Sequence, residues 1–155
     1  MALTHSALRQ ALATRIAGIS GWWEAPVPAD SFSPSAVPDA IPASKAHLAF
    51  AVGLGESTII DGRHKASVGV HLHTPARLRF YARHTPGMTI SQTSQDAALD
   101  ARQALIVRVM AQDATWPSSF QIARILAIPE LVLLPTGEWF LGGLDVECLH
   151  PLPLS

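Results

Sequence analysis

Hydrophobic positions recur at helical spacing near the start of the chain. From about residue 4 to residue 19 they fall on one side of a helix, and Gly18 and Gly21 close the run. The apolar positions are Leu3, Leu8, Leu12, Ile16 and Ile19. Arg9 and Arg15 lie off this stripe. The pattern predicts a first amphipathic helix.

Proline interrupts the pattern over residues 24–46. The segment contains Pro26, Pro28, Pro34, Pro38 and Pro42, which forbid a regular helix and disfavour a central strand. We therefore expect an extended loop over 24–46. A loop of this length needs something to hold it, either its own domain or a neighbouring subunit.

From His47 the hydrophobic period changes to two, which is typical of strands. Leu48, Phe50, Val52 and Leu54 alternate with small residues. The segment "DGRH" at 61–64 predicts a turn, in which Asp-Gly is followed by basic residues, and Arg63 and Lys65 belong to this basic stretch. A second alternating run contains Val68, Val70 and Leu72. We expect it to continue past a kink at Pro75 into Leu78, Phe80 and Ala82, with His71, His73, Arg77, Arg79, Tyr81 and Arg83 on the opposite, polar side.

A second helix is predicted from about Ser94 or Asp96 to Met110. It has a broad apolar side, and Asp96, Asp100 and Gln103 share one polar side. Extended runs follow at 120–128 and 131–134, and a "PTG" turn leads to a last strand at 139–150. This order predicts one α+β domain over 1–155, with an antiparallel or mixed sheet of about four strands and two main helices packed on one face.

Composition favours burial against other molecules. The chain has 155 residues and a net charge of −1. Its fraction of charged residues, 15%, is low, and together with 48% apolar residues it leaves more apolar surface than a freely soluble monomer usually has. The near-zero charge gives no general attraction to nucleic acid or to anionic membranes. The N-terminus does not have the pattern of a signal peptide, and no run of 18 apolar residues occurs, so we expect a soluble protein made in the cytosol.

Candidate chemistry is sparse. His71 and His73 are spaced as metal ligands on one strand face, with His64 and His84 in turns nearby. No Asp, Glu or Cys stands at ligand spacing beside them, which favours solvated or interfacial histidines over a metal site. Cys148, the single cysteine, alternates with Leu144 and Val146 as a core residue does. Asp96 and Asp100 are one helical turn apart, where they would complement the helix dipole. We expect no catalytic residue, cofactor or metal.

The stripe of Arg77, Arg79 and Arg83 is the sharpest local feature. It fits pairing with acids of a neighbouring subunit, a solvated strand face, or contact with a DNA backbone. The four tryptophans stand beside loops without interleaved basic residues, which favours core or interface anchors over a surface that stacks bases.

The layout resembles the tail terminator, or tail completion, proteins of long-tailed bacteriophages. The parts that carry the resemblance are the N-terminal helix, the Pro-rich passage, the strand "HLAFAV", the helix "SQDAALDARQALIVRVM" and the closing "GEWFLGGLDVECLHPLPL". The resemblance implies a virion protein that forms a ring, expected to be a hexamer, at the head-proximal end of the tail tube. It implies contacts with the tail tube protein and the head-tail connector, and passing contact with DNA in the lumen.

Several alternatives remain at this point. A head completion or connector protein of the neck would use similar interfaces. A small metal-dependent enzyme would need His71 and His73, and a ligand-binding domain would need an apolar pocket. For a ring, the residues expected at subunit boundaries are Arg77, Arg79, Arg83, Asp96, Asp100, Gln103, Arg63 and Lys65.

Overall fold

The fold is α+β, as the sequence predicts. The computed structural model describes residues 4–23, 26, 47–59, 71–84, 90–111, 116, 120–135 and 137–151. Along the chain the elements are α1 (His5–Ala17), β1 (Phe50–Leu54), β2 (Thr58–Ile59), β3 (His71–Arg83), α2 (Ile90–Met110), β4 (Gln121–Ala127), β5 (Val132–Leu133) and β6 (Trp139–Pro151). The expected loop at 24–46 and the turn at 61–64 lie outside the described residues, apart from Pro26.

The described strands form one antiparallel sheet in the order β1-β3-β6-β4. The sheet has six strands, so the prediction of about four is wrong in number. The difference has a simple origin: β2 and β5 are two-residue strands that extend the edges, β2 pairing with β3 and β5 with β6. The sheet therefore consists of four rows, and its two outer rows are broken.

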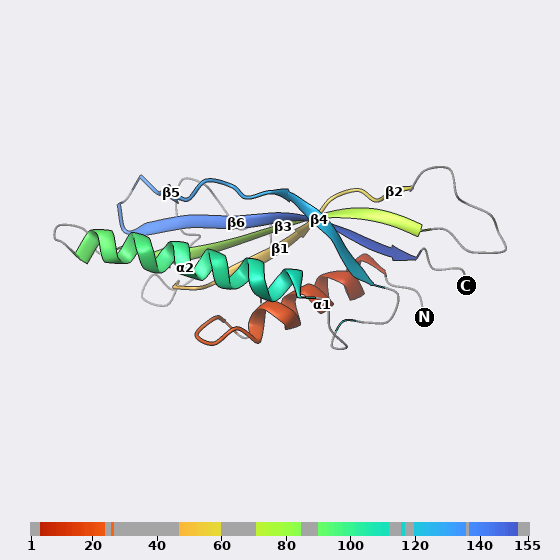
Figure 1. Ribbon diagram of the computed structural model, residues 1–155, viewed down its shortest axis with the longest axis horizontal. Helices are drawn as coiled ribbons and strands as arrows, with labels where there is room; N and C mark the ends of the chain where they lie inside the picture. The colour runs from red at the N-terminus through yellow and green to blue at the C-terminus, as the bar shows by residue number, and fades with distance from the viewer. Residues whose placement is uncertain are drawn as a thin grey trace.

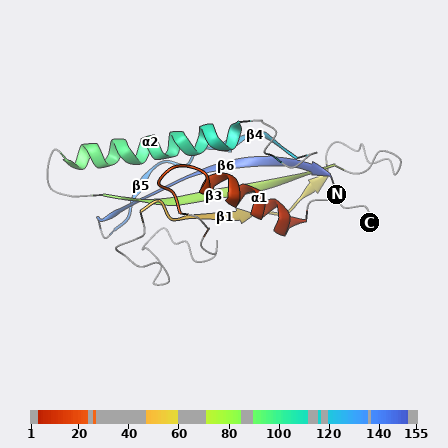
Figure 2. The same ribbon diagram turned by 90° about the horizontal axis from the view of Figure 1, so that it is seen from below.

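Both helices lie on one face of the sheet, as expected (Figure 1). α1 packs on β1, and α2 packs on β3 and β6 and runs along the length of the sheet (Figure 2). The row formed by β4 and β5 lies beside this covered region (Figure 1).

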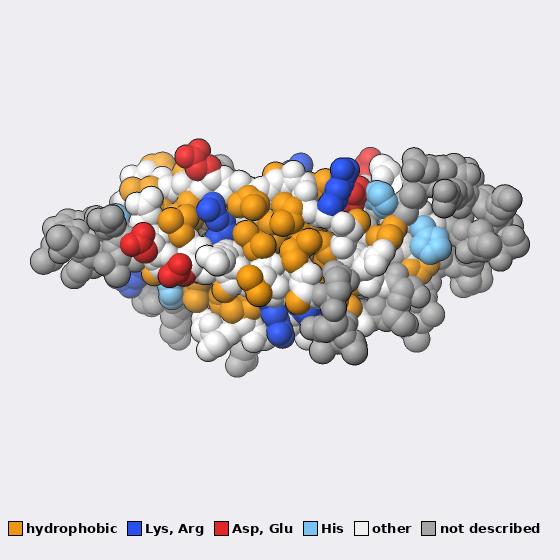
Figure 3. Space-filling model, in the orientation of Figure 1, with side chains coloured by type: hydrophobic (Ala, Val, Ile, Leu, Met, Phe, Trp, Pro, Cys, Tyr) orange, Lys and Arg blue, Asp and Glu red, His pale blue; other side chains and the backbone are white. Residues whose placement is uncertain are grey.

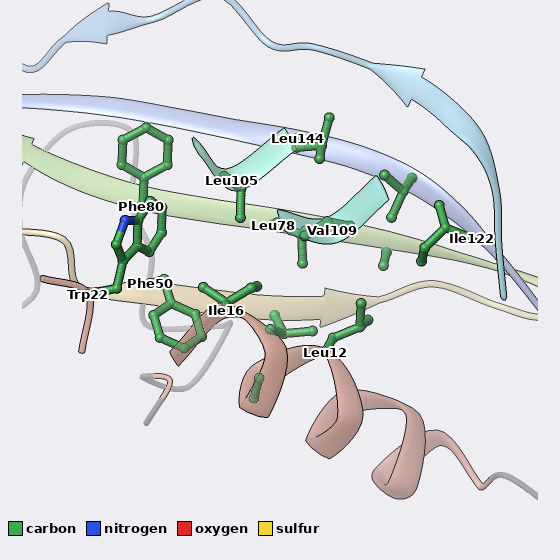
Figure 4. Close-up of a cluster of buried hydrophobic side chains, with 14 of the residues drawn as sticks. Leu12, Ile16, Trp22, Phe50, Leu78, Phe80, Leu105, Val109, Ile122 and Leu144 are labelled. Carbon is green, nitrogen blue, oxygen red and sulfur yellow. The ribbon is translucent and has the colours of Figure 1, made fainter. Parts of the chain in front are cut away.

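The main core lies between the helices and the sheet (Figure 4). Leu12 and Ile16 of α1 and Leu105 and Val109 of α2 meet Phe50, Leu78, Phe80 and Leu144 of the strands. These side chains are at most 1% exposed. Trp22 adds its ring to this core, 5.2 Å from the ring of Phe80. Burial of such side chains is the main force holding the layers together.

β3 confirms the alternation and corrects the expected kink. The strand runs from His71 through Pro75 to Arg83, and its pairing with β6 is continuous. The Pro75 carbonyl accepts a hydrogen bond from the Gly55 amide, so the side of Pro75 without an N–H faces the break between β1 and β2. The missing donor therefore costs no ladder bond, and the proline is tolerated inside a long strand.

Two other expectations were wrong. α2 begins at Ile90, earlier than Ser94 or Asp96. Tyr81, expected on the polar side of β3, is fully buried in a second small cluster with Ala49, Leu134 and Trp139. This cluster covers one end of the sheet face opposite the helices, so that face is not uniformly polar.

The two helices are joined at their C-terminal ends by arginines. Arg15, placed off the apolar stripe by its position in the sequence, is only 5% exposed. Its Nε donates to the carbonyl of Arg108 at 3.0 Å and its Nη2 to the carbonyl of Ala111 at 2.9 Å. Trp116 lies under its guanidinium, 4.5 Å away. Cations at helix C-termini bind the carbonyls that have no partner within the helix.

Candidate interaction surfaces

The arginine stripe lies on the sheet face opposite the helices, where β3 alternates its side chains. Arg77 and Arg83 are exposed, whereas Arg79 is only partly exposed. Arg79 Nη1 lies 2.6 Å from Asp145 Oδ1 of β6, so this guanidinium is neutralised within its own chain. The stripe therefore presents Arg77 and Arg83 outward, and it does not act as three equivalent free cations.

Gly143 makes the Arg79–Asp145 pair possible. In the ladder Arg79 stands opposite Gly143, and Arg77 opposite Asp145, so Arg79 reaches its partner diagonally. A Cβ at Gly143 would lie 2.8 Å from Arg79 Nη1 and 2.9 Å from its Cδ. The absence of a side chain at this position leaves the path that the arginine crosses.

Arg83, at the end of β3, contacts Trp139 with its side chain and His47 with its backbone. Its guanidinium carbon is 5.9 Å from the ring of Trp139, and its backbone N–H donates to His47 Nδ1 at 3.1 Å. Burial and the nearby Arg83 charge both lower the pKa of His47. Among the described residues no carboxylate pairs with Arg77 or Arg83, so both charges face outward.

The histidine pair is divided between two environments. His71 is exposed, and His73 Nδ1 lies 2.7 Å from Glu147 Oε1. The other oxygen of Glu147 accepts from Arg124 Nε at 2.7 Å, which ties β4 to β6. Burial raises the pKa of Glu147, but the hydrogen bonds from Arg124 and His73 outweigh it, so the pKa falls below its usual value. Sequence spacing could not reveal Glu147, which is 74 residues from His73.

No group of three or more possible metal ligands occurs in the described part of the chain. His84, a third candidate ligand, packs its ring 4.9 Å from that of Phe140, and His64 lies outside the described residues. Cys148 is fully buried in the main core as predicted, and burial raises the pKa of its thiol to about 12.

The polar side of α2 is exposed. Asp96, Asp100 and Gln103 all face outward from the helix. α2 begins six residues before Asp96, and its first turn holds no acidic residue. The expected role of Asp96 and Asp100 at the helix dipole is therefore wrong, because the dipole acts within the first turn. Two further candidates for a subunit boundary, Arg63 and Lys65, lie outside the described residues.

Exposed apolar side chains lie on α2 and along the β4–β5 row. Hydrophobic side chains gather there on the helix side of the molecule (Figure 3). We define the edge patch as the exposed large apolar residues of α2 and of the β4–β5 row, which are Val107, Ile125, Leu126, Ile128, Val132 and Leu133. Side chains alternate along a strand, so neighbours such as Val132 and Leu133 lie on opposite faces and the edge patch extends around the edge of the sheet. Their exposed fractions run from 37% for Ile125 to 64% for Val107. The run "ILAI" at 125–128 gives no specific signal of it, because an unbroken apolar run is equally typical of a buried strand.

The edge patch coincides with a sheet edge. β4 is the last strand in the order β1-β3-β6-β4, so one side of its backbone has no neighbouring strand among the described elements. Two shifts of register against β6, at Ile122/Arg124 and Ile125/Ala127, bend this edge. Such irregularities limit indiscriminate strand pairing while leaving the apolar side chains accessible.

Comparison with models of known protein families and with curated proteins finds no match. No helix in the described part of the chain is long and apolar enough to cross a membrane.

Proposed function

We propose that this chain is a structural virion protein that forms a hexameric ring at the head-proximal end of a phage tail tube. The ring ends polymerisation of the tube and joins the tail to the head connector. The proposal begins with the resemblance carried by the sequence, and the edge patch is the observation that supports it best. The role needs interfaces with copies of itself, with the tail tube protein and with the connector, and it needs no catalytic residue.

The edge patch suits a contact between subunits. Large exposed apolar surfaces on a protein of low charge mark interaction sites. Neighbours in a ring meet through two different surfaces, and the edge patch supplies one of them. The sheet exposes two cations, Arg77 and Arg83, and helix α2 exposes two carboxylates, Asp96 and Asp100. These opposite charges suit a head-to-tail contact in which the sheet of one subunit meets α2 of the next. Alternatively, Arg77 and Arg83 line the lumen of the ring and contact the DNA that passes through it.

A comparison of the free energy of apolar burial with the cost of association favours assembly on the tube. Full burial of one large aliphatic side chain contributes about 1.5–3 kcal/mol, so burying the exposed halves of six contributes roughly 6 kcal/mol. Association of two proteins costs about 4–15 kcal/mol in lost freedom and ordering. The edge patch alone therefore gives weak pairing. Subunits aligned by the end of a tube have already lost much of that freedom, so they close the ring there.

Charged substitutions in the edge patch test this role. Val107→Asp combined with Ile125→Asp should leave the subunit folded by circular dichroism but abolish ring formation on tubes in negative-stain images. Gln10→Asp, on an exposed position of α1, is the matched control and should form rings as the wild type does. Rings of normal shape in the double variant would remove the edge patch from the assembly contact.

A neck protein of the head side is the second candidate, because the same surfaces would serve it. The two roles differ in the partner that the ring binds. A head completion protein binds the connector in the absence of tail tubes, whereas a tail terminator binds tube ends in the absence of heads.

A further inference from the structure

Two histidines of β3 lie on the sheet face opposite the helices. His71 and His73 are two residues apart in one strand, and side chains at this spacing lie on the same face. The residues that alternate with them, Leu72 and Thr74, are buried. His71 is exposed, and the side chain of His73 is 29% accessible. Both rings are therefore within reach of a ligand from solvent.

Glu147 determines which nitrogen of His73 is free. His73 Nδ1 lies 2.7 Å from Glu147 Oε1, and the other carboxylate oxygen accepts from Arg124 Nε at 2.7 Å. A carboxylate can only accept hydrogen bonds, so Nδ1 of His73 carries the proton. In the neutral ring Nε2 then has a lone pair, and it has no partner among the described residues.

A histidine held in this way is oriented as a metal ligand. Metal-binding histidines almost always donate their second ring N–H to a carboxylate, a carbonyl or water, which fixes the ring and raises its basicity. The sequence shows no acidic residue at ligand spacing beside His71 and His73, but the sheet supplies one. Glu147 stands opposite Pro75 in the ladder and reaches His73 diagonally.

The spacing of the two histidines allows one ion to bind both rings. Alternate residues of a strand are about 6.8 Å apart, and two Zn–N bonds of about 2.1 Å span at most about 4.2 Å, so the rings must lean toward each other. His71 can supply this movement, because it is exposed and has no hydrogen bond or ion pair with another described residue. His73 remains on Glu147. The pair thus has one fixed ligand and one adjustable ligand.

The charges around the pair are compatible with a divalent cation. Arg124 and Glu147 neutralise each other, and the arginine binds the carboxylate oxygen that does not bind His73. The nearest arginine of β3, Arg77, is four residues from His73, or about 14 Å along the strand, a distance at which salt screens most of its charge. The residues paired with the two histidines on the neighbouring strands are uncharged, namely Pro151, Leu149 and Thr58.

We propose that His71 and His73 form a binding site for one zinc ion, through Nε2 of each ring, with Glu147 as the outer partner of His73. Two protein nitrogens leave two positions of a tetrahedral site for water or for donor atoms of another molecule. Imidazole suits zinc and similar transition metals, whereas magnesium and calcium prefer oxygen ligands. The site is separate from the edge patch, and its test does not depend on assembly.

Calorimetric titration of the full chain with zinc chloride at pH 7.5 tests the site. We expect one zinc ion per chain in the wild type. His71→Gln and His73→Gln should each weaken binding by more than about tenfold, because one of the two protein ligands is lost. Glu147→Gln keeps both ligating nitrogens and should weaken binding about 10–100-fold, the usual effect of removing an outer partner.

A matched control and a second readout complete the test. His47→Gln, at an exposed histidine near the other end of β3, should bind zinc as the wild type does. Nitrogen chemical shifts should place zinc on Nε2 of His71 and His73, with Nδ1 of His73 still protonated. Wild-type affinity in His71→Gln or His73→Gln, zinc on Nδ1 of His73, or no zinc binding by the folded wild type would overturn the proposal.

Discussion

Arg15 and Arg108 cap each other's helices. Nε of Arg15 donates to the carbonyl of Arg108, and Nε of Arg108 donates to the carbonyl of Arg15, each at 3.0 Å. The C-terminal ends of α1 and α2, 93 residues apart in sequence, are thereby held together. Because both helices meet the sheet through the same core, this contact fixes where α2 presents Val107 and its acidic side.

Replacing Arg15 by methionine should destabilise the fold by about 3 kcal/mol. Methionine keeps much of the buried volume but removes the charged donor to the carbonyls of Arg108 and Ala111. The Ala111 carbonyl keeps the indole N–H of Trp116 as a donor, whereas the Arg108 carbonyl loses the Arg15 side chain, and a hydrogen bond to a charged group contributes about 1.5–3 kcal/mol. Urea unfolding measures the loss. Arg9→Met, at an exposed position of the same helix, is the control and should change stability by less than about 0.5 kcal/mol. Equal effects of the two substitutions would mean that the arginine caps contribute little.

The Arg79–Asp145 pair should contribute a coupling energy of about 1 kcal/mol. The pair is partly exposed, with side chains 26% and 20% accessible, so the value lies between that of a surface ion pair and that of a buried charged hydrogen bond. A double-mutant cycle with Arg79→Met and Asp145→Asn, followed by urea unfolding, measures it. Additive losses in the double variant would show that the two groups do not interact in solution.

Assembly should depend on Arg77 and Arg83 more than on Arg79. Arg79 is already paired within its chain, whereas the other two charges face outward. Arg77→Glu with Arg83→Glu should reduce ring formation, which negative-stain imaging on tubes measures. Arg79→Gln retains an exposed hydrogen-bonding group without a charge and should assemble normally. The reverse order of effects would place Arg79 in the subunit contact.

Stability should fall as the pH drops below 6.5. The pKa values of His47 and His150 are both lowered from 6.5 in the folded state, His47 by burial and by Arg83, and His150 chiefly by burial. The unfolded chain therefore binds more protons just below pH 6.5, so this stability is fully present above pH 6.5 and is lost as the pH falls through the folded values. The lowered pKa of Glu147 acts below pH 4.5 and does not enter this window.

Urea midpoints at pH 7.5 and pH 5.5 measure this loss. His47→Asn keeps an acceptor for the Arg83 amide but cannot be protonated, so its midpoint should fall less than that of the wild type. A midpoint that is unchanged or higher at pH 5.5 in the wild type would contradict the assigned shifts.

Periodicity predicted much of the fold because most elements bury a regular face. The alternation in β3 placed Leu78 and Phe80 on the core side correctly, and Cys148 follows the same rule on β6. The rule failed where a polar group finds its partner through tertiary contact. Arg15 was placed off the apolar stripe by its position in the sequence, yet it is buried, because the carbonyls at the end of α2 satisfy its guanidinium.

The candidate surface was only partly predictable for the same reason. The cations of β3 are visible in the sequence, but the pairing of Arg79 with Asp145 depends on a strand register that spans 66 residues. The edge patch depends on which strand is outermost and on how far α2 extends over the sheet. Neither property is encoded in a local pattern, so an apolar run such as 125–128 is equally consistent with a buried strand.

The length of tail tubes polymerised with and without this protein tests the proposed role most directly. Purified tail tube protein of the same phage is allowed to polymerise, and tube lengths and ends are recorded in negative-stain images. We expect tubes that stop growing when the protein is added, with a ring of six subunits at one end. Tubes that continue to grow with bare ends, while the protein remains monomeric by light scattering, would contradict the proposed function.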